Sequence, residues 1–217
     1  DYYIGQATIE MDENNNLTSD ENACRLNGDN VYAKASQINF IDVAPSQIVS
    51  ITTSIIPFLD HDDATRALMG SNMQRQAVPL LRTEAPLIGT GVEYIAARDS
   101  GSTIVCKADG VVEYADAKKI VVKTQKDKDV YYLANFERSN AESCINHSPI
   151  VVAGEKVHKG EVIADGPSTD KGELALGKNM VVAFMTCNGY NYEDAVVLNE
   201  RLVKDDVYTS LHIEHYD

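Results

Sequence analysis

Apolar and polar positions divide the chain into many short apolar runs and one longer stretch with helical composition. Residues 62–77 consist mainly of good helix formers, and either Asp60 or Asp62 can cap the first turn of a helix. Pro79 cannot continue a helix and pushes the residue before it toward an extended conformation. The pattern therefore predicts one prominent central helix at about residues 62–77.

Most other apolar runs have the length of strands, and glycines and polar turns separate them. The charged residues 125–129 have the composition of a hairpin tip. The strands predicted after the helix include residues 87–92, 103–106, 111–114, 120–124, 131–136, 151–152, 162–163, 181–185, 196–198 and 207–213. We therefore expect a mostly β (α+β) fold, a sandwich-barrel or partial barrel of short strands with one central helix.

The first part of the chain has a pattern of its own. Residues 2–11 alternate enough for a strand, residues 12–16 form a polar turn, and residues 31–43 hold one or two short strands. We interpret residues 1–43 as the remnant of a β-rich domain that begins upstream. There is no initiator Met, and the strand pattern at 208–216 stops abruptly, as expected for a fragment of a longer polypeptide.

Charge and composition narrow the function classes. The chain of 217 residues carries 33 acidic and 19 basic residues, a formal net charge of −14, which argues against a free-standing nucleic-acid-binding protein. No run is long enough to span a membrane and no signal peptide is present, so we expect a cytoplasmic protein. No pair of cysteines has zinc-ligand spacing, so we expect free thiols at Cys24, Cys106, Cys144 and Cys187.

The predicted helix is unusually polar. Arg66 and Arg75 are nine positions apart and point to nearly opposite sides, while Asn72, Arg75 and Gln76 share one face. An arginine can hold phosphate oxygens in a forked, permanently charged grip. The alternative is a weak ion pair within the helix, between Asp62 and Arg66 at four-residue spacing.

Adjacent acidic residues near the end of the chain are candidates for metal binding. Glu193 and Asp194 are hard oxygen ligands of the kind that Mg²⁺ accepts, usually with waters retained. On a regular strand they would point to opposite faces, so both can reach one ion only from a bend, and residues 188–191 supply turn residues. The alternative is a pair of solvated acidic side chains.

Three motifs of this chain resemble, in order, segments of the β subunits of bacterial DNA-directed RNA polymerases. They are residues 60–79 (DHDDATRALMGSNMQRQAVP), 165–177 (DGPSTDKGELALG) and 188–195 (NGYNYEDA). The resemblance spans nearly the whole chain and is weakest in residues 1–40. It implies that residues 1–43 belong to an inserted β-rich domain. Residues 44–217 then belong to the hybrid-binding core domain of the β subunit, truncated at its C-terminal end.

The resemblance also implies roles for the helix. Arg66 would contact the phosphates of the incoming nucleoside triphosphate (NTP), with Asp63 beside it. Arg75 and Gln76 would line the path of the RNA end and the template. The family often has Asn where this chain has Thr65, so we assign no ligand contact to position 65.

By the same resemblance, Glu193 and Asp194 would approach the second Mg²⁺, bound to the nucleotide, through water. The first Mg²⁺ would belong to the partner β′ subunit. The implied activity is nucleotidyl transfer in DNA-templated RNA synthesis, with catalytic contributions from Arg66, Glu193 and Asp194. The implied partners are the β′ and α subunits, the remainder of the β chain, the RNA–DNA hybrid and NTPs. We expect the fragment alone to be inactive.

Two alternatives belong to other function classes. Residues 154–163 resemble a hairpin of biotinyl and lipoyl carrier domains, and residues 169–171 resemble a lipoyl attachment signature, which would make Lys171 of the segment 151–172 the attachment site. Against this, the chain has no matching second half, and residues 167–168 lack the acidic residue that a carrier requires. The second alternative is a module that binds a basic regulator through its acidic surface.

Overall fold

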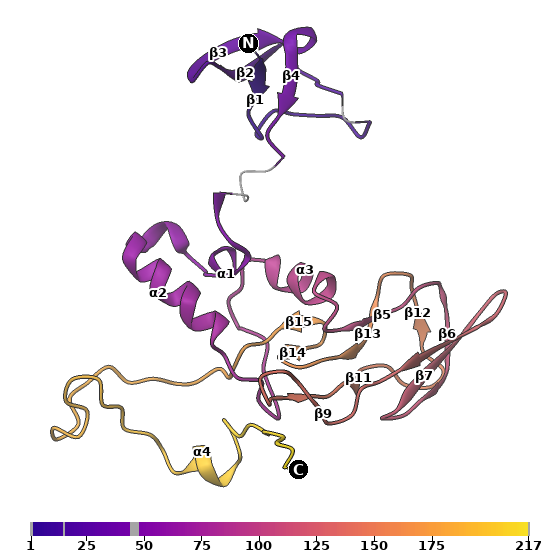
Figure 1. Cartoon of the computed structure of the whole chain (residues 1–217), viewed down its shortest axis with the longest axis vertical. Helices are drawn as coiled ribbons and strands as arrows, with labels where there is room; N and C mark the ends of the chain where they lie inside the picture. Colours follow the sequence, from indigo (N-terminus) through magenta and orange to yellow (C-terminus); the bar gives the residue numbers. More distant parts are fainter. Residues whose placement is uncertain (1, 15, 44–47, 217) are drawn as a thin grey trace. The chain divides into compact units, whose positions relative to one another are not determined.

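The structure is a computed structural model and describes residues 2–14, 16–43 and 48–216. The chain folds as two units, Asp1–Ser50 (unit 1) and Ile51–Asp217 (unit 2) (Figure 1). Within the described ranges, we find no helix with the length and apolar character needed to cross a membrane.

Unit 1 is built on one four-stranded sheet in the order β3-β2-β1-β4, with β1 parallel to β4 and the other pairs antiparallel. Cys24 and Ala33 are its buried apolar side chains among the described residues. Its elements are β1 (Tyr3–Gly5), β2 (Glu21–Leu26), β3 (Asp29–Lys34), η1 (Ala35–Gln37) and β4 (Ile38–Ile41).

The sequence prediction for unit 1 was partly wrong. The predicted strand at 2–11 is limited to β1, and the strand β2 was not predicted. β2 and β3 are joined by Asn27 and Gly28, with φ of 52° and 97°. Positive φ at both central residues is typical of the type I′ turn that Asn-Gly favours, so this dipeptide is the signal that predicts the hairpin.

Among the described residues, unit 2 contains the α-helices, and the longest is α2. The side chain of Asp63 caps α2 by accepting a hydrogen bond from the Thr65 backbone N–H at 3.0 Å. The prediction of a central helix is confirmed, but its cap is neither Asp60 nor Asp62, because both precede the extended Asp63. The helices are α1 (Ile51–Ser54), η3 (Leu59–His61), α2 (Ala64–Arg75), α3 (Val92–Asp99) and α4 (Arg201–Lys204).

Four small sheets make up the β part of unit 2. Their strand orders are β12-β6-β7-β8, β11-β13-β5, β9-β10 and β14-β15, and every pair is antiparallel. The strands are β5 (Ile104–Val105), β6 (Gly110–Ala115), β7 (Lys119–Thr124), β8 (Lys128–Tyr132), β9 (Glu137–Arg138), β10 (Cys144–Ile145), β11 (Ser148–Pro149), β12 (Lys156–Val157), β13 (Val162–Asp165), β14 (Thr169–Asp170) and β15 (Glu173–Leu174).

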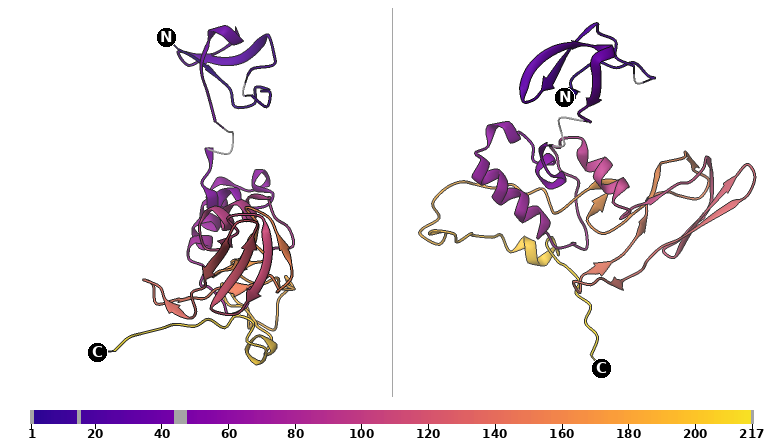
Figure 2. Two further views of the ribbon diagram at one scale, coloured as in Figure 1. Left: turned by 90° about the vertical axis from the view of Figure 1, so that its right-hand side faces the viewer. Right: turned by 45° about the horizontal axis from the view of Figure 1, so that its top comes forward.

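The core of unit 2 lies between the two larger sheets (Figure 2). Ile120 and Val122 of β7 and Ile163 and Ala164 of β13 are fully buried there. On β7 the buried residues alternate with exposed or half-buried ones, as expected for a sheet with one face on a core. The prediction of a mostly β fold is confirmed, and no closed barrel forms among the described residues.

Several predicted strands of unit 2 do not form. Residues 87–91 precede α3 and residue 92 is its first residue, while residues 181–185 and 196–198 contain neither helix nor strand. Residues 207–213 make only the isolated bridges Leu80–Ser210 and Ser143–His212. High β propensity forms a strand only where another strand offers its backbone hydrogen bonds, and residues 181–185 have no such neighbour in the described part of the chain.

Candidate functional site

The helix α2 is anchored on one side only. Ser71 is buried, and its hydroxyl lies 2.8 Å from the Thr52 hydroxyl and 3.2 Å from that of Thr53. These three polar side chains tie α2 to α1. The remaining side chains of α2 are exposed or half-buried, so the helix presents most of its circumference to solvent.

Arg66 lies in the first turns of α2 with its guanidinium exposed. Its Nη1 lies 3.6 Å from the sulfur of Met69, one turn further along. The intrahelical pair with Asp62 does not form, because Asp62 is extended and lies before the helix. Among the described residues Arg66 has no carboxylate partner, so its charge is available to an anion.

Arg75 and Gln76 end the same helix. Arg75 Nη2 donates a hydrogen bond to the side-chain oxygen of Asn72, which orients the guanidinium along the last turn. Gln76 is the C-cap, and its backbone N–H donates to the Met73 carbonyl at 3.0 Å. Both side chains are exposed.

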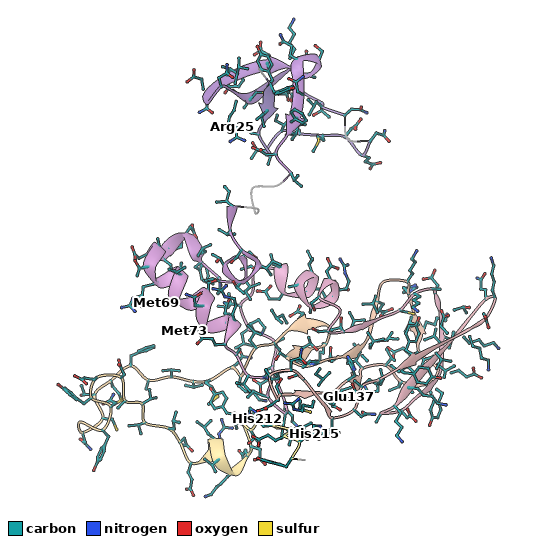
Figure 3. The ribbon with its side chains drawn as sticks, viewed as in Figure 1. Arg25, Met69, Met73, Glu137, His212 and His215 are labelled. Atoms are coloured by element: carbon teal, nitrogen blue, oxygen red, sulfur yellow. The ribbon has the colours of Figure 1, made fainter. Side chains whose placement is uncertain are left out.

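Large apolar side chains accompany these polar groups. Leu68, Met69 and Met73 are exposed on α2. Figure 3 shows Met69 and Met73 on the side of α2 that faces away from α3. The contact between Arg66 and Met69 was not predicted, although the three-residue spacing is the signal that allows it. The outward side of α2 is therefore a mixed polar and apolar surface.

Glu193 and Asp194 lie on an irregular segment after a turn that Asn191 holds closed. The Asn191 side chain accepts from the Cys187 backbone N–H at 2.9 Å and donates to the Met185 carbonyl at 2.6 Å. Glu193 has a φ of 55°, in the left-handed region, so the chain bends at the acidic pair. The expectation that these residues lie on a bend agrees with this geometry, and both carboxylates are exposed.

The acidic pair, Glu193 and Asp194, offers too few ligands to hold a metal ion by itself. Among the residues that the structure describes, no group of three or more His, Cys, Asp or Glu side chains is arranged to hold a metal ion. Two carboxylates can serve Mg²⁺ when phosphate oxygens and waters supply its other ligands. Glu193 and Asp194 are two adjacent exposed carboxylates, and they do not make a complete metal site by themselves.

No hydrogen bond or ion pair between described residues joins α2 to the acidic pair. A pocket of about 580 Å³ lies elsewhere in unit 2, lined in part by Arg82, Cys144 and Lys178, and none of the predicted site residues lines it. The predicted residues thus form exposed surfaces rather than an enclosed pocket.

Comparison with known proteins matches this chain to two family models. The model described as RNA polymerase Rpb2, domain 6, matches residues 105–217. The model described as RNA polymerase beta subunit external 1 domain matches residues 1–44.

Three proteins named DNA-directed RNA polymerase subunit beta are similar to the whole chain. Those of Acetivibrio thermocellus, Anaeromyxobacter dehalogenans and Macrococcus caseolyticus are 56%, 53% and 53% identical to it. Each alignment covers 100% of this chain, but only 17%, 16% and 19% of the respective relative. The chain therefore spans less than a fifth of the length of these relatives.

The two family models match residues 1–44 and 105–217, and the second includes the motifs at 165–177 and 188–195. The identity to the relatives extends from end to end and so includes residues 60–79 between the two models. The resemblance first carried by residues 60–79, 165–177 and 188–195 is thereby confirmed, and the chain belongs to the family of bacterial RNA polymerase β subunits.

Proposed function

We propose that this segment supplies part of the active-site surface of a DNA-directed RNA polymerase, which joins NTPs into RNA along a DNA template. The observation that carries the proposal is the exposed guanidinium of Arg66 on an anchored helix, without a carboxylate partner among the described residues. A fixed, unpaired arginine is suited to neutralising phosphate charge.

In this proposal the two ends of α2 have different tasks. Arg66 binds phosphate oxygens of the incoming NTP, and Asp63 fixes the start of the helix beside it. Arg75 and Gln76 lie one helix length away and contact the RNA end and the template. The exposed methionines between them, such as Met73, pack against whatever covers the helix in the assembled enzyme.

Glu193 and Asp194 help to place the second Mg²⁺ of the reaction through water. When bound, this ion would neutralise charge on the triphosphate. In this role the two carboxylates orient the waters around the ion, and the positive φ of Glu193 puts the pair on a bend rather than on a regular strand. Two carboxylates hold Mg²⁺ weakly, so we expect the isolated chain to bind it poorly and to be inactive.

The proposal extends to domains and partners. We assign residues 1–43 to an inserted β-rich domain and residues 44–217 to the hybrid-binding core, truncated at its C-terminal end. The partners are then the β′ and α subunits, the remainder of the β chain, the RNA–DNA hybrid and NTPs, in the bacterial cytoplasm.

Of the alternatives, the carrier domain is not supported. Lys171 is exposed in the two-residue turn between β14 and β15, where a carrier would present its lysine. The family match over residues 105–217 includes this hairpin, so the hairpin resemblance has an explanation without an attached cofactor. The alternative of a module that binds a basic regulator rests on the net charge of −14 alone.

The first test replaces Arg66 by Ala in a reconstituted polymerase. Loss of one phosphate contact is expected to raise the KM for NTPs by about tenfold or more. The matched control is Arg201→Ala, which removes another exposed arginine of unit 2 from the helix α4. An unchanged KM and rate in Arg66→Ala would contradict the phosphate role.

The second test concerns the metal. The double variant Glu193→Ala/Asp194→Ala is expected to slow RNA extension and to raise the Mg²⁺ concentration needed for half-maximal rate by severalfold. The control is Asp205→Ala/Asp206→Ala, a second exposed pair of adjacent acidic residues. A wild-type Mg²⁺ titration for the first pair would exclude it from placing the ion.

A further inference from the structure

One face of the sheet β12-β6-β7-β8 lies away from the core of unit 2. Strand alternation directs Val112, Ile120 and Val122 into the core, so their neighbours along each strand point to solvent. The left view of Figure 2 looks onto this sheet. We call the solvent-facing side chains of β6, β7, β8 and β12 the outer sheet face.

The outer sheet face is positively charged. Its charged side chains are Glu113, Lys119, Lys123, Lys128 and Lys156, all exposed. Lys123 and Lys128 are paired directly across β7 and β8, a position at which like charges repel. One glutamate cannot neutralise four lysines, so this face attracts anions although the whole chain has a net charge of −14.

The carboxylates close to this face are already engaged. Glu113 lies 2.7 Å from the Lys128 ammonium, and this hydrogen bond holds the pKa of Glu113 below its ordinary value. Asp116, at the turn between β6 and β7, accepts from the backbone N–H groups of Lys118 and Lys119 at 2.8 and 2.7 Å. Asp116 therefore stabilises the turn and also interacts with Lys119, whereas Lys123 and Lys156 have no carboxylate within ion-pair distance among the described residues.

The middle of the outer sheet face is apolar. Val121 is paired with Val130 on one side and with Tyr114 on the other. Tyr132, directly opposite Lys119, has 78% of its surface exposed. An apolar centre with charges around it has the layout of a protein interface, whose core is apolar and whose rim is polar. β8 is also an edge strand in the described part of the chain, so it borders this face with unpaired backbone groups.

We infer that the outer sheet face is a docking surface for a protein segment that combines carboxylates with apolar side chains. The carboxylates would pair with Lys123 and Lys156, and with Lys128 in competition with Glu113, and the apolar side chains would cover Val121 and Val130. This inference does not depend on the role proposed for α2.

The apolar centre favours a protein partner over a nucleic acid. Single-stranded nucleic acids are held by exposed aromatic rings on which bases stack. Here the Lys119 ammonium lies 5.6 Å from the centre of the Tyr114 ring and covers one side of it. Tyr132 is then the one fully accessible ring among the described residues of this face, and the valines beside it contact aliphatic groups better than phosphates.

The test measures binding of short labelled probes to the whole 217-residue chain by fluorescence anisotropy. The main probe is a fluorescein-labelled peptide that carries Leu at helical spacing and Glu at the other positions. It should bind at low ionic strength and weaken as salt screens the lysines. The comparison probes are a peptide of Glu alone and an oligothymidylate of similar length.

Matched variants locate the binding. Lys123→Gln/Lys128→Gln/Lys156→Gln should weaken binding by about tenfold, whereas the control Lys34→Gln/Lys171→Gln/Lys204→Gln, also exposed, should change it by less than about twofold. Val121→Thr/Val130→Thr preserves side-chain shape and strand propensity. It should weaken binding of the Leu-containing peptide by severalfold. Circular dichroism verifies that each variant remains folded.

The outcomes separate the possibilities. Binding of the Glu–Leu peptide that both variant sets weaken supports the inference. Equal binding by the lysine variant and its control would overturn it. Tighter binding of the oligothymidylate than of the peptide, lost in the lysine variant, would also overturn it and would identify the face as a nucleic-acid surface.

Discussion

Two regions of unit 2 contain similar apolar residues, but one region buries them and the other leaves them exposed. Residues 92–175, which we call the packed region, bury Ile120 and Ile163 completely. Residues 178–216, the open region, contain a single buried apolar side chain among those described, Leu202, while Phe184 is 98% exposed. The two regions differ in strand partners, because the packed region contains all four described sheets of unit 2 and the open region contains none of its named strands.

The comparison teaches that an apolar run of strand length forms a buried strand only where other strands or side chains pack against it. In the packed region the partner comes from the same chain, so the run becomes a buried strand. In the open region the exposed run at residues 181–185 forms a large apolar surface. Exposed apolar patches of this kind mark surfaces that other protein covers, in keeping with a chain that spans less than a fifth of its relatives.

The largest expected difference between the regions is in the cost of removing a side chain. Ile120→Ala should lower the free energy of unfolding by about 2–5 kcal/mol, because it leaves a cavity in the packed core. Phe184→Ala removes a larger side chain but should change stability by less than about 0.5 kcal/mol. Urea unfolding followed by circular dichroism measures both, and equal losses would remove the distinction between the regions.

A smaller difference in stability is expected between alanine substitutions at two glycines, Gly166 inside the packed region and Gly177 just before the open region. A Cβ at Gly166 would lie 1.8 Å from the Ser102 carbonyl oxygen, so Gly166→Ala must displace backbone and should destabilise by about 1–3 kcal/mol. A Cβ at Gly177 meets nothing within 4 Å, so Gly177→Ala should be neutral or slightly stabilising. The same unfolding measurement compares them. If Gly166→Ala left the free energy of unfolding unchanged, the backbone at Ser102 would have to move aside at no energetic cost.

The smallest expected effect is a pH dependence at the start of α3. Glu93 is 6% exposed and accepts from the backbone N–H groups of Thr90 and Gly91, each at 2.8 Å. Burial alone would raise its pKa, but these hydrogen bonds outweigh burial and hold the pKa below 4.5. Glu93 therefore stabilises the fold fully above pH 4.5, and this contribution is lost as the pH falls through its lower folded pKa.

The measurement is the free energy of unfolding against pH for wild type, Glu93→Gln and Glu193→Gln. The loss of stability below pH 4.5 should be shallower in Glu93→Gln, which cannot ionise, while Glu193→Gln, altered at an exposed carboxylate of the open region, should follow wild type. Identical pH profiles for wild type and Glu93→Gln would show that the hydrogen-bonded carboxylate contributes nothing.

Local sequence predicts the packed region well. The strands expected at 111–114 and 120–124 form, and the turn between β7 and β8 lies in the predicted hairpin tip. The helix α3 was missed, although Thr90 and Glu93 have the spacing of a capping box, and Glu93 does bond back to the Thr90 backbone. In the open region, strands were predicted from propensity alone, and propensity cannot say whether a partner strand exists.

For the candidate site, local sequence predicts individual residues but not their arrangement in space. Arg66 and Glu193 could be selected from motif resemblance, and the exposure of Arg66 follows from a helix anchored through Ser71 on its other side. The spatial relation of Arg66 to Glu193 is not predictable from spacing, because more than a hundred residues separate them and no contact between described residues joins their segments. A site that several segments share is set by their assembly and not by local pattern.

The positions of the free thiols have a practical consequence. Cys24 lies in the core of unit 1 and Cys106 in the core of unit 2, and both are almost completely buried. Burial raises the pKa of the Cys24 thiol, so it reacts slowly in the folded state. Each unit therefore contains a buried cysteine that becomes reactive only when the unit opens. The rate at which an alkylating reagent modifies each cysteine, assigned by peptide mass, reports how often that unit opens.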